Sequence, residues 1–460
     1  MLKRKMYDKL LAWKSAPKKK VLILLGARQT GKTFIVREFA RDNYPNFLEV
    51  NFLEDEDDAA FLAGADSADE LVSRLSLIAG RALEPGTLVF LDEVQRAASN
   101  IVTLSKFLLD DGRFDLILSG SLLGAALEGV TSFPVGYART ERMYPLDFEE
   151  FCWATGVPVS IIDKVKTCYR DKKPLEHTLH ERLTKLYRQY IAVGGMPEAV
   201  QRFLDGNRDL GAAREVATDI AEQYRFDITK YATGRKLQIR TIFDNIPSQL
   251  SKENKRFMMK SVKQGATYER LDDDFAWLVS AGVALPTVIA SEPKYPLART
   301  KVPEKFKLYS SDCGLLLAQY PQVAAIEVVS GEGDANFGAV YENVVAQEIK
   351  AAGFPLYYYH NSRKGEMDFL LETGEGTVIP LEVKSGKDYK HHVALNNLLE
   401  TEEYGIECAY VLSEHNVSTE VREGKPVYYL PLYMTLCLSL ERGNDLEGVK
   451  LEEVSFDDWT

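Results

Sequence analysis

The sequence lacks paired cysteines and long apolar runs. The first absence argues against an oxidising compartment, and the second argues against a membrane-spanning protein. Its five cysteines are scattered, with no Cys-x-x-Cys pair, which argues against a disulfide framework and a zinc site and favours a reducing compartment. No apolar stretch is long enough to span a bilayer. The basic segment from Met1 to Lys20 lacks the apolar core of a signal peptide. We therefore expect a cytoplasmic protein with no membrane partner.

The chain also lacks an excess of positive charge. Its formal net charge at pH 7 is −12, which gives no overall attraction for nucleic acid, so any DNA contact must come from a local basic patch. Apolar residues make up 45% and charged residues 27% of the sequence, as in soluble globular proteins. At 460 residues the chain is too long for one hydrophobic core, and roughly two to four domains are expected.

The strongest motif is a glycine-rich loop of the form G-x-x-x-x-G-K-[ST]. An apolar run from Val21 to Leu25 precedes the loop and is typical of a buried parallel strand, and Phe34 to Phe39 follows with helical apolar spacing. Strand, glycine loop and helix together predict a P-loop that binds phosphates. The loop consists of Gly26, Ala27, Arg28, Gln29, Thr30, Gly31, Lys32 and Thr33.

The residue types of this loop predict binding of ATP and Mg²⁺. The glycines let backbone amides turn toward the phosphates, and the N-terminus of the following helix adds its positive dipole end. Lys32 is expected to reach the β- and γ-phosphates, and the Thr33 hydroxyl to ligate Mg²⁺. The alternative, a chance glycine turn beside a lysine, is disfavoured because strand, loop and helix agree.

Polar side chains follow two later strands. The apolar run from Thr87 to Leu91 ends in Asp92 and Glu93, and the carboxyl edge of a parallel sheet is where α/β proteins bind ligands. Asp92 is predicted to hold Mg²⁺ and Glu93 to polarise the attacking water. A further strand ends at Ser119 and Ser121, either of which is placed to sense the γ-phosphate, with ordinary turn chemistry as the alternative.

Two more strands complete the expected sheet. The segment from Asn46 to Phe52 forms a strand between the P-loop and the acidic strand in sequence, and Arg139 to Tyr144 supplies a fifth strand. Arg139 or Arg142 could act as an arginine finger on a nucleotide of its own or a neighbouring subunit. Solvated surface arginines are the more common case.

This core resembles the AAA+ group of P-loop ATPases, an α/β fold with an extra strand between the P-loop strand and the acidic strand. Leu118 to Ser121, Tyr144 to Phe151 and Gly194 to Val200 further resemble a prokaryotic family of AAA-type ATPases. The resemblance covers nearly the whole chain and implies ATP binding. It also implies a C-terminal domain of unknown function that is related to restriction-endonuclease-like folds.

Four parts are expected along the chain. They are a P-loop ATPase domain at residues 1–150, a helical lid at 151–235, a winged-helix-like domain at 236–325 and a nuclease-like α/β domain at 326–460. In the third part, helices are expected at Ile239–Ile246, at the basic segment Lys255–Lys263 and from Thr267 onward, and a wing at Val283–Ala290 and Lys305–Tyr309. Winged helices often bind duplex DNA through the third helix, but here it contains Asp272-Asp273-Asp274, so packing against protein is an equal alternative.

The last part holds a second set of candidate site residues. Gly365–Glu372 and Val378–Lys384 are expected to form neighbouring strands, which would bring Asp368 beside Glu382 and Lys384. These residues resemble the PD-(D/E)XK nuclease site, in which two acids bind Mg²⁺ and the lysine helps to activate water or steady the phosphate.

Two observations bear on whether this second site cleaves nucleic acid. Glu342, on the preceding helix, matches an accessory acid of such nucleases. However, the helix expected from His391 to Glu400 has no Gln-x-x-x-Tyr pattern, and charged residues alternate on many surface strands. A binding domain that has kept these residues is therefore the alternative.

The sequence thus predicts a Mg²⁺-dependent, ATP-binding and ATP-hydrolysing AAA+ protein that acts on DNA through a nuclease-like domain. The alternative is a nucleotide-gated signalling or scaffold protein with a catalytically inert C-terminal domain. In either case the lid and the winged-helix-like module are candidate contacts for a protein partner or a second copy of the chain.

Overall fold

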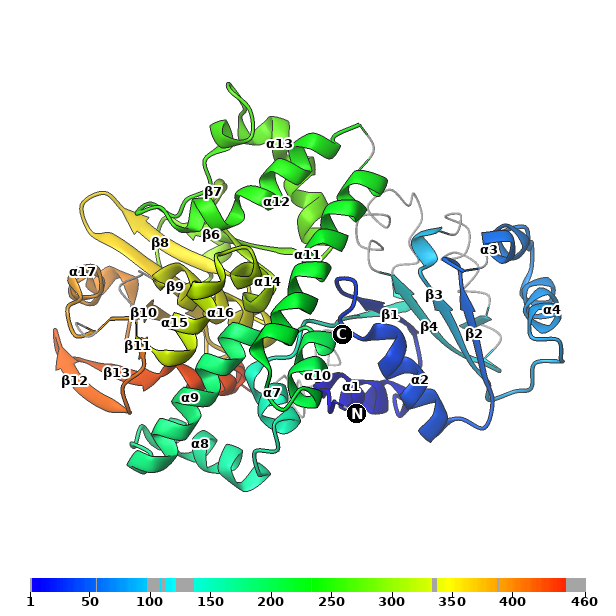
Figure 1. The fold of residues 1–460 in the computed structure, drawn as a ribbon, viewed down its shortest axis with the longest axis horizontal. Coiled ribbons are helices and arrows are strands. Elements are labelled where there is room, and N and C mark those ends of the chain that lie inside the picture. The colour runs from blue at the N-terminus through cyan, green and yellow to red at the C-terminus, as the bar shows by residue number, and fades with distance from the viewer. Residues whose placement is uncertain are drawn as a thin grey trace, which may run out of the picture.

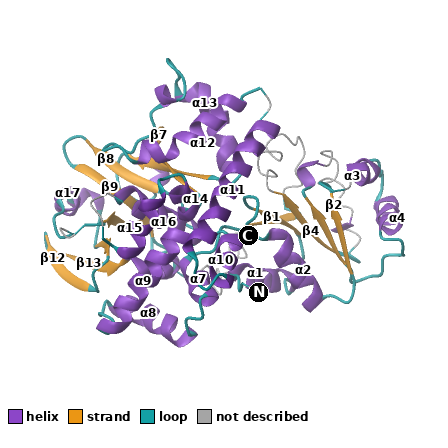
Figure 2. Ribbon diagram, in the orientation of Figure 1, coloured by secondary structure: helices purple, strands orange, loops and turns teal. Residues whose placement is uncertain are grey.

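The chain folds around two β-sheets that lie at opposite ends of the molecule, with helices between them (Figure 1). This computed structural model describes residues 2–54, 56–96, 108–109, 112–120, 136–232, 234–332, 337–386 and 389–443. Figure 2 shows that the space between the sheets is filled mainly by helices. In the described ranges, no helix combines the length and the apolar character needed to cross a membrane.

The first sheet has five parallel strands in the order β2-β3-β4-β1-β5. The strand β2, expected at Asn46–Phe52, forms and lies beside β3, while β4 lies between the P-loop strand β1 and the acidic strand β3. The α/β class is confirmed. The strands of this sheet are β1 (Val21–Leu25), β2 (Phe47–Asn51), β3 (Leu88–Asp92), β4 (Asp115–Gly120) and β5 (Ala138–Arg142). Its helices include α1 (Lys5–Lys14), α2 (Lys32–Asn43), α3 (Glu56–Ala63) and α4 (Ala68–Ile78), with a short 3₁₀ turn η1 (Val94–Arg96) after β3.

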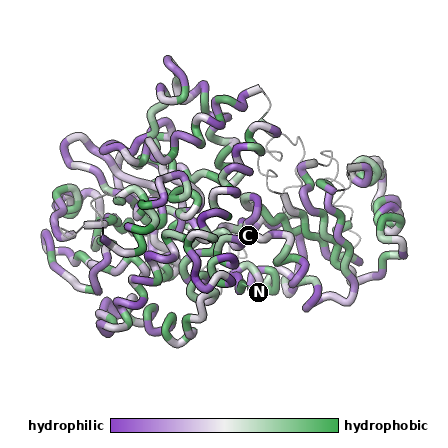
Figure 3. The backbone as a smooth tube through the Cα atoms, in the orientation of Figure 1, coloured by the Kyte–Doolittle hydropathy of each residue, from purple (hydrophilic) through white to green (hydrophobic). Residues whose placement is uncertain are grey.

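Both faces of this sheet are covered, as a parallel sheet requires. Leu22 and Leu24 of β1 enter a core shared with Trp13 of α1 and Phe39 of α2. The intervening Ile23 enters the core on the opposite face, which includes residues of α3 and α4. The continuous apolar composition of β1 follows from this two-sided burial, and Figure 3 shows apolar stretches in this sheet, whereas the edge strand β5 is mainly polar.

Helices connect the first sheet to the second. They are α7 (Phe148–Ala154), α8 (Val159–Asp171), α9 (His177–Val193), α10 (Pro197–Asp205) and α11 (Leu210–Tyr231). The helix α7 begins with a capping box between Asp147 and Glu150. Gly194 and Gly195 separate α9 from α10, and a side chain would not fit at Gly195, because its Cβ would lie 2.1 Å from the carbonyl oxygen of Leu146.

The next segment contains α12 (Lys236–Leu250), the 3₁₀ turn η2 (Met259–Ser261), α13 (Tyr268–Ser280), β6 (Ala284–Ala290), the 3₁₀ turn η3 (Leu297–Thr300) and β7 (Lys301–Ser310). The helix expected at Lys255–Lys263 is absent, and only the three-residue turn η2 forms there. The reason is a long-range contact: the backbone N–H of Phe257 donates to the carbonyl of Phe306 at 2.9 Å, which holds this segment extended against β7. Local helix propensity is overridden by this pairing.

The second sheet has eight strands in the order β12-β13-β11-β10-β9-β8-β6-β7. Its remaining elements are α14 (Cys313–Ala318), α15 (Gln322–Ser330), α16 (Gly338–Ala351), β8 (Tyr357–Asn361), β9 (Gly365–Glu372), β10 (Val378–Val383), α17 (Val393–Glu400), η4 (Glu402–Tyr404), β11 (Ala409–Ser413), β12 (Ser418–Arg422), β13 (Lys425–Pro431) and η5 (Leu432–Arg442). The two strands expected as a wing, β6 and β7, belong to this sheet, since β6 also pairs in parallel with β8.

One hydrophobic core joins the central helices to the second sheet. It includes Tyr190 of α9, Phe243 of α12, Val344 of α16 and Leu381 of β10. The segment from α7 onward therefore packs as one body, and the parts expected at 151–235, 236–325 and 326–460 share their interior.

Candidate functional site

The predicted P-loop connects β1 to α2. Gly31 precedes the first residue of α2 with φ +90°, and Gly26 has φ +153°, so both adopt backbone conformations that L side chains rarely take. A Cβ on Gly26 would also lie 2.3 Å from the carbonyl oxygen of Met143. The local geometry therefore requires glycine at both positions, and the loop leaves a hollow at the N-terminus of α2.

The Lys32 side chain lies within this hollow and is 6% exposed. Its Nζ donates to the carbonyl oxygens of Gly26 at 2.9 Å and Ala27 at 2.8 Å. Burial lowers the pKa of Lys32 to about 8, and the carboxylates of Glu93 and Asp92 oppose that fall. The ammonium lacks a direct carboxylate partner at ion-pair distance among the described residues, so it can turn toward an anion in the loop.

Three of the predicted site residues meet at the carboxyl edge of the sheet. The Thr33 Oγ1 donates to Asp92 Oδ2 at 2.5 Å, and the Ser119 Oγ donates to Asp92 Oδ1. Asp92 is 2% exposed, so its carboxylate is fixed by these contacts. A hydroxyl and a carboxylate at the end of a P-loop helix are the groups that bind Mg²⁺ in nucleotide sites. Ser121, the other sensor candidate, lies outside the described residues.

Glu93 follows Asp92 in a strained conformation. Its φ is +56°, in the left-handed region that non-glycine residues rarely adopt, and its backbone N–H donates to Asp92 Oδ1 at 3.0 Å. The carboxylate accepts a hydrogen bond from the Gln95 side chain. Gln95 was not predicted as a site residue, because nothing in the sequence indicates that its side chain turns back toward Glu93.

Lys32, Thr33 and Glu93 border a cavity of about 960 Å³. Arg28, Lys32 and Glu93 line one side of it, and Pro197 and Gln201 of α10 line another. Its volume is at the upper end of the range for small-molecule sites. The nucleotide cavity, as we call it, is thus formed jointly by the P-loop domain and the central helices.

The P-loop also contacts the central helices directly. Arg28 forms an ion pair with Asp227 of α11, and the Tyr224 hydroxyl donates to the carbonyl of Arg28 at 3.0 Å. The Gln29 side chain donates to Gln223 at 2.6 Å. Arg28 and Gln29, which occupy variable positions of the motif, therefore bind the P-loop to α11.

The remaining predicted residues of the first domain are the two arginines. Arg139 forms an ion pair with Glu141 at 2.8 Å. Arg142 lies at the end of β5 and lines a second cavity of about 410 Å³ together with Arg4 and Glu348. Neither is among the residues that line the nucleotide cavity. Arg142 also lines a smaller cavity of about 140 Å³ with Gly26 and Ala27 of the P-loop.

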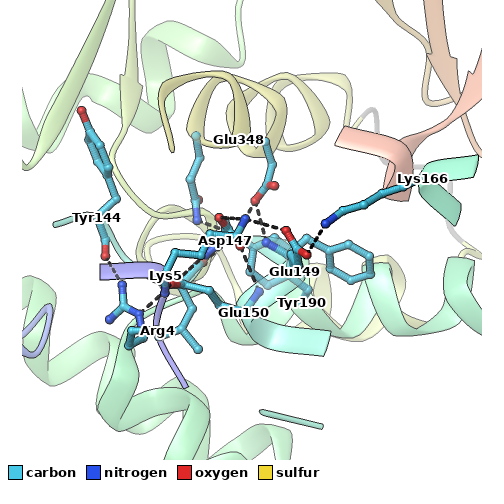
Figure 4. A network of polar contacts seen from close by, with 12 residues as sticks. Arg4, Lys5, Tyr144, Asp147, Glu149, Glu150, Lys166, Tyr190 and Glu348 are labelled. Atoms are coloured by element: carbon cyan, nitrogen blue, oxygen red, sulfur yellow. Dashed lines mark hydrogen bonds and ion pairs between the residues drawn. The ribbon is translucent and has the colours of Figure 1, made fainter. Parts of the chain in front are cut away.

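Arg4 connects the P-loop to α7 and was not singled out from the sequence. Its guanidinium is 7% exposed and donates to the carbonyl of Thr30 at 2.9 Å, to the carbonyl of Tyr144 at 2.6 Å and to Glu150 Oε2 at 3.0 Å (Figure 4). A basic N-terminal segment usually lies on the surface, which is why the sequence gave no reason to place this arginine inside. Lys5 extends the network to Asp147 at 2.6 Å.

The same network reaches α16 (Figure 4). Glu348 Oε1 accepts a hydrogen bond from the backbone N–H of Phe148 at 3.0 Å and from the Tyr190 hydroxyl at 2.7 Å. Burial raises the pKa of Glu348 to about 8, and the nearby carboxylate of Asp147 adds to the shift. Arg4, α7 and Glu348 thus form a continuous polar path from the P-loop to α16, which we call the buried relay.

Glu348→Gln is expected to flatten the pH dependence of stability. The pKa rises from 4.5 to about 8 on folding, so the folded chain keeps a proton that the unfolded chain loses, and stability falls as the pH rises through that range. Glutamine keeps an acceptor for Phe148 and Tyr190 and cannot ionise. Melting temperatures at about pH 5 and about pH 8 should therefore differ less than in the parent, while exposed Glu304→Gln should leave the difference unchanged. An equal difference in Glu348→Gln would contradict this account.

The second set of predicted residues lies in the middle of β9 (Asp368) and at the end of β10 (Glu382 and Lys384). These strands pair antiparallel, and Asp368 Oδ2 accepts a hydrogen bond from the backbone N–H of Val383 at 2.9 Å. Glu382 and Lys384 form an ion pair at 2.7 Å. Burial raises the pKa of Asp368 to about 7, and the carboxylates of Glu342 and Glu382 contribute. The structure therefore brings together the residues that the strand pattern predicted.

A lysine that the sequence analysis did not single out lies among these acids. Lys307 of β7 places its Nζ 2.7 Å from Glu366 Oε1, 3.6 Å from Glu342 Oε2 and 3.7 Å from Asp368 Oδ1. We call Glu342, Glu366, Asp368 and Glu382 the carboxylate cluster. Because the strand carrying Lys307 was expected to form a wing of the part at 236–325, nothing in the sequence placed Lys307 beside Asp368.

This arrangement does not fit the divalent ion that was expected between Asp368 and Glu382. Both oxygens of Glu382 are engaged, one by Lys384 and the other by His392 Nδ1 at 2.7 Å. Across the part of the chain that the structure describes, no three His, Cys, Asp or Glu side chains are arranged to hold a metal ion. The predicted residues therefore lie close together as expected. They do not form the expected metal site, because Asp368 and Glu382 already have lysine partners.

Three segments of the chain match known sequence families. Residues 18–152 match an AAA domain, residues 184–324 match a domain of unknown function (DUF8612), and residues 337–433 match another domain of unknown function (DUF4143). A comparison with curated proteins gave no match.

Several solved structures are similar to this chain. The Walker-type ATPase PABY2304 of Pyrococcus abyssi is 14% identical with a TM-score of 0.42, and the match covers 69% of this chain and 96% of that one. The Aeropyrum pernix ORC1 protein, solved in complex with DNA, is 14% identical with a TM-score of 0.26 over 72% and 91% of the two chains. The Thermotoga maritima RuvB Holliday junction branch migration motor is 15% identical with a TM-score of 0.29 over 62% and 90%.

The match to the AAA domain covers the P-loop, the acidic strand and the strand that carries Ser119. It agrees with the strand order and with the contacts that join Thr33, Asp92 and Ser119. Residues 18–152 form an AAA-type P-loop ATPase domain.

Proposed function

We propose that this protein is a Mg²⁺-dependent ATPase of the reducing cytoplasm in which the nucleotide state of the P-loop controls the C-terminal sheet. The observation that carries the proposal is the buried relay, since Arg4 contacts the P-loop carbonyl of Thr30 and the α7 residue Glu150 with one guanidinium. The five unpaired cysteines agree with a reducing compartment.

The residues of the nucleotide cavity fit ATP and Mg²⁺. The loop amides and Lys32 would hold the phosphates, and Thr33 and Asp92 would hold the ion, which would neutralise charge on the phosphates when bound. Glu93 lines the cavity and would orient and polarise the attacking water, and Ser119 fixes the Asp92 carboxylate. Hydrolysis would then change the contents of a cavity whose wall includes Arg4 itself.

A path for the signal follows from the hydrogen bonds. A shift of Thr30 on nucleotide binding would displace the Arg4 guanidinium, which also holds Glu150 in the first turn of α7. The N-terminus of α7 is in turn bonded to Glu348 of α16 through the Phe148 N–H. Arg4, Glu150 and Glu348 are buried and hydrogen-bonded to their neighbours. A movement of one of them is therefore expected to move the groups bonded to it.

The relay is tested with a paired substitution. Arg4→Gln alone leaves Glu150 as an unpaired buried charge and should cost on the order of 3–5 kcal/mol of stability. Arg4→Gln with Glu150→Gln removes both charges and should restore most of that loss. In the parent chain, a non-hydrolysable ATP analogue should change hydrogen–deuterium exchange in both α7 and α16, whereas the double variant should bind the analogue without the change in α16.

A neighbouring lysine supplies the matched control for this experiment. Lys3 is exposed and lies over the Trp153 ring, so Lys3→Gln should keep the response in α16. If the double variant still transmits the change to α16, the relay is not the path of control. If the parent itself shows no nucleotide binding by calorimetry, the ATPase proposal fails as a whole.

A second candidate function is binding of DNA by a nuclease-like C-terminal domain, with cleavage as the alternative outcome of the test. It is favoured by one observation, the gathering of Asp368, Glu382 and Lys384 on the neighbouring strands β9 and β10, as in PD-(D/E)XK nucleases. Nicking of supercoiled plasmid DNA with Mg²⁺ or Mn²⁺, lost on Asp368→Asn, would support cleavage. DNA binding without nicking would support a binding domain. If the protein neither binds nor nicks DNA, the nucleotide-gated switch stands alone as the proposed function.

A further inference from the structure

Lys307 is a fully buried cation at the centre of the second sheet's acidic residues. It is 1% exposed, and its side chain extends from β7 past the Tyr358 ring of β8, whose centroid lies 5.1 Å from Nζ. An isolated ammonium in such a position would be costly, because burial removes its hydration. Its position is therefore maintained by the charges around it.

Three surrounding acids from two elements compensate this charge. Glu342 comes from α16 and Glu366 and Asp368 come from β9, and their carboxylates lie 2.7–3.7 Å from Nζ. Although burial opposes it, these three carboxylates raise the pKa of Lys307. The ammonium is accordingly charged in the folded chain, and it offers three N–H donors to oxygens that would otherwise repel one another.

The other oxygens of the carboxylate cluster are also occupied. Glu342 accepts a hydrogen bond from the Tyr309 hydroxyl at 2.9 Å and forms an ion pair with Lys255. Asp368 Oδ2 accepts the Val383 N–H. A divalent ion would have to displace these donors and would be placed beside a buried ammonium of like charge.

We propose that the Lys307 ammonium is the resident cation of the carboxylate cluster and occupies the place that a divalent metal ion would take. The C-terminal sheet then maintains its acidic centre without a metal, and metal-dependent cleavage is blocked by a side chain of the same chain. This inference concerns the second sheet alone and does not depend on the proposed nucleotide switch.

The proposal is tested by titrating Mn²⁺ into the full-length chain without nucleotide. The parent and all variants in this titration carry Asp92→Asn, so that the P-loop carboxylate cannot provide a second binding site for Mn²⁺. With Lys307 present, no Mn²⁺ should bind at the cluster, and Asp368→Asn should not alter binding. Lys307→Met should lower the melting temperature by roughly 5 °C, gain one Mn²⁺ per chain, and recover stability when Mn²⁺ is added.

Two further proteins make the outcome specific. Adding Asp368→Asn to Lys307→Met should abolish both Mn²⁺ binding and the recovery. Lys305→Met, an exposed lysine on the same strand, should behave like its parent. Mn²⁺ bound by the Lys307 protein and lost on Asp368→Asn would overturn the proposal, as would a folded Lys307→Met protein that binds no Mn²⁺. If Lys307→Met does not fold, the two proteins that keep Lys307, with and without Asp368→Asn, still decide whether the cluster binds Mn²⁺.

Discussion

Glu93→Gln is expected to lower the rate of ATP hydrolysis by about 100- to 10,000-fold, the contribution typical of a general base, while ATP affinity stays within about a factor of two. Glutamine has nearly the same shape and can keep the contact with Gln95, but it lacks the negative charge that polarises water. The left-handed backbone at this position is set by its neighbours and should not change. Phosphate release under saturating ATP measures the rate, and calorimetry measures the affinity.

Asp92→Asn separates the two acidic residues. Asp92 accepts hydrogen bonds from Thr33 and Ser119, so its replacement should weaken the Mg²⁺ dependence of nucleotide binding as well as turnover. If Glu93→Gln turns over at the parental rate while Asp92→Asn does not, the division of roles between the two acids is wrong.

Lys32→Ala is expected to weaken ATP binding by about 100-fold or more, because charge-assisted hydrogen bonds to phosphate are worth a few kcal/mol in a buried site. The folded state should tolerate the change, since Lys32 now donates only to carbonyls of its own loop and burial disfavours its charge. Calorimetric titration with an ATP analogue measures the loss.

An exposed lysine near the same strand provides the comparison for this variant. Lys20→Ala alters surface charge just before β1 and should leave the affinity unchanged. Equal affinities for Lys32→Ala and the parent would mean that the glycine loop is not a P-loop. A lowered melting temperature without a change in affinity would assign Lys32 a purely structural role.

The elements of the P-loop domain could be predicted because their signals are local. The apolar runs of β1 and β3 indicate burial on both faces, and the polar residues at their ends identify the binding edge of the sheet. Asp92, Thr33 and Ser119 meet there as this geometry requires. The same local reasoning placed Asp368 beside β10, because strand alternation and a short turn determine the pairing.

The residues that the sequence did not identify act over long separations. Arg4 contacts Glu150, which is 146 residues away, and Lys307 meets carboxylates that follow it by 35 to 61 positions. In sequence, each is one basic residue among several, and nothing local distinguishes it from a solvated neighbour. The segment Lys255–Lys263 illustrates the same difficulty, since its contact with β7 replaced the expected helix.

The eight-stranded sheet crosses the boundary between the two domains of unknown function. The strands β6 and β7 lie within residues 184–324, whereas β8 to β13 lie within residues 337–433. A gene rearrangement that passed on one of these segments without the other would split the sheet between β6 and β8. Each fragment would then expose the unpaired backbone N–H and C=O groups of a new edge strand, which favours aggregation with other chains. We therefore expect a chain that carries one segment without the other to be prone to aggregation.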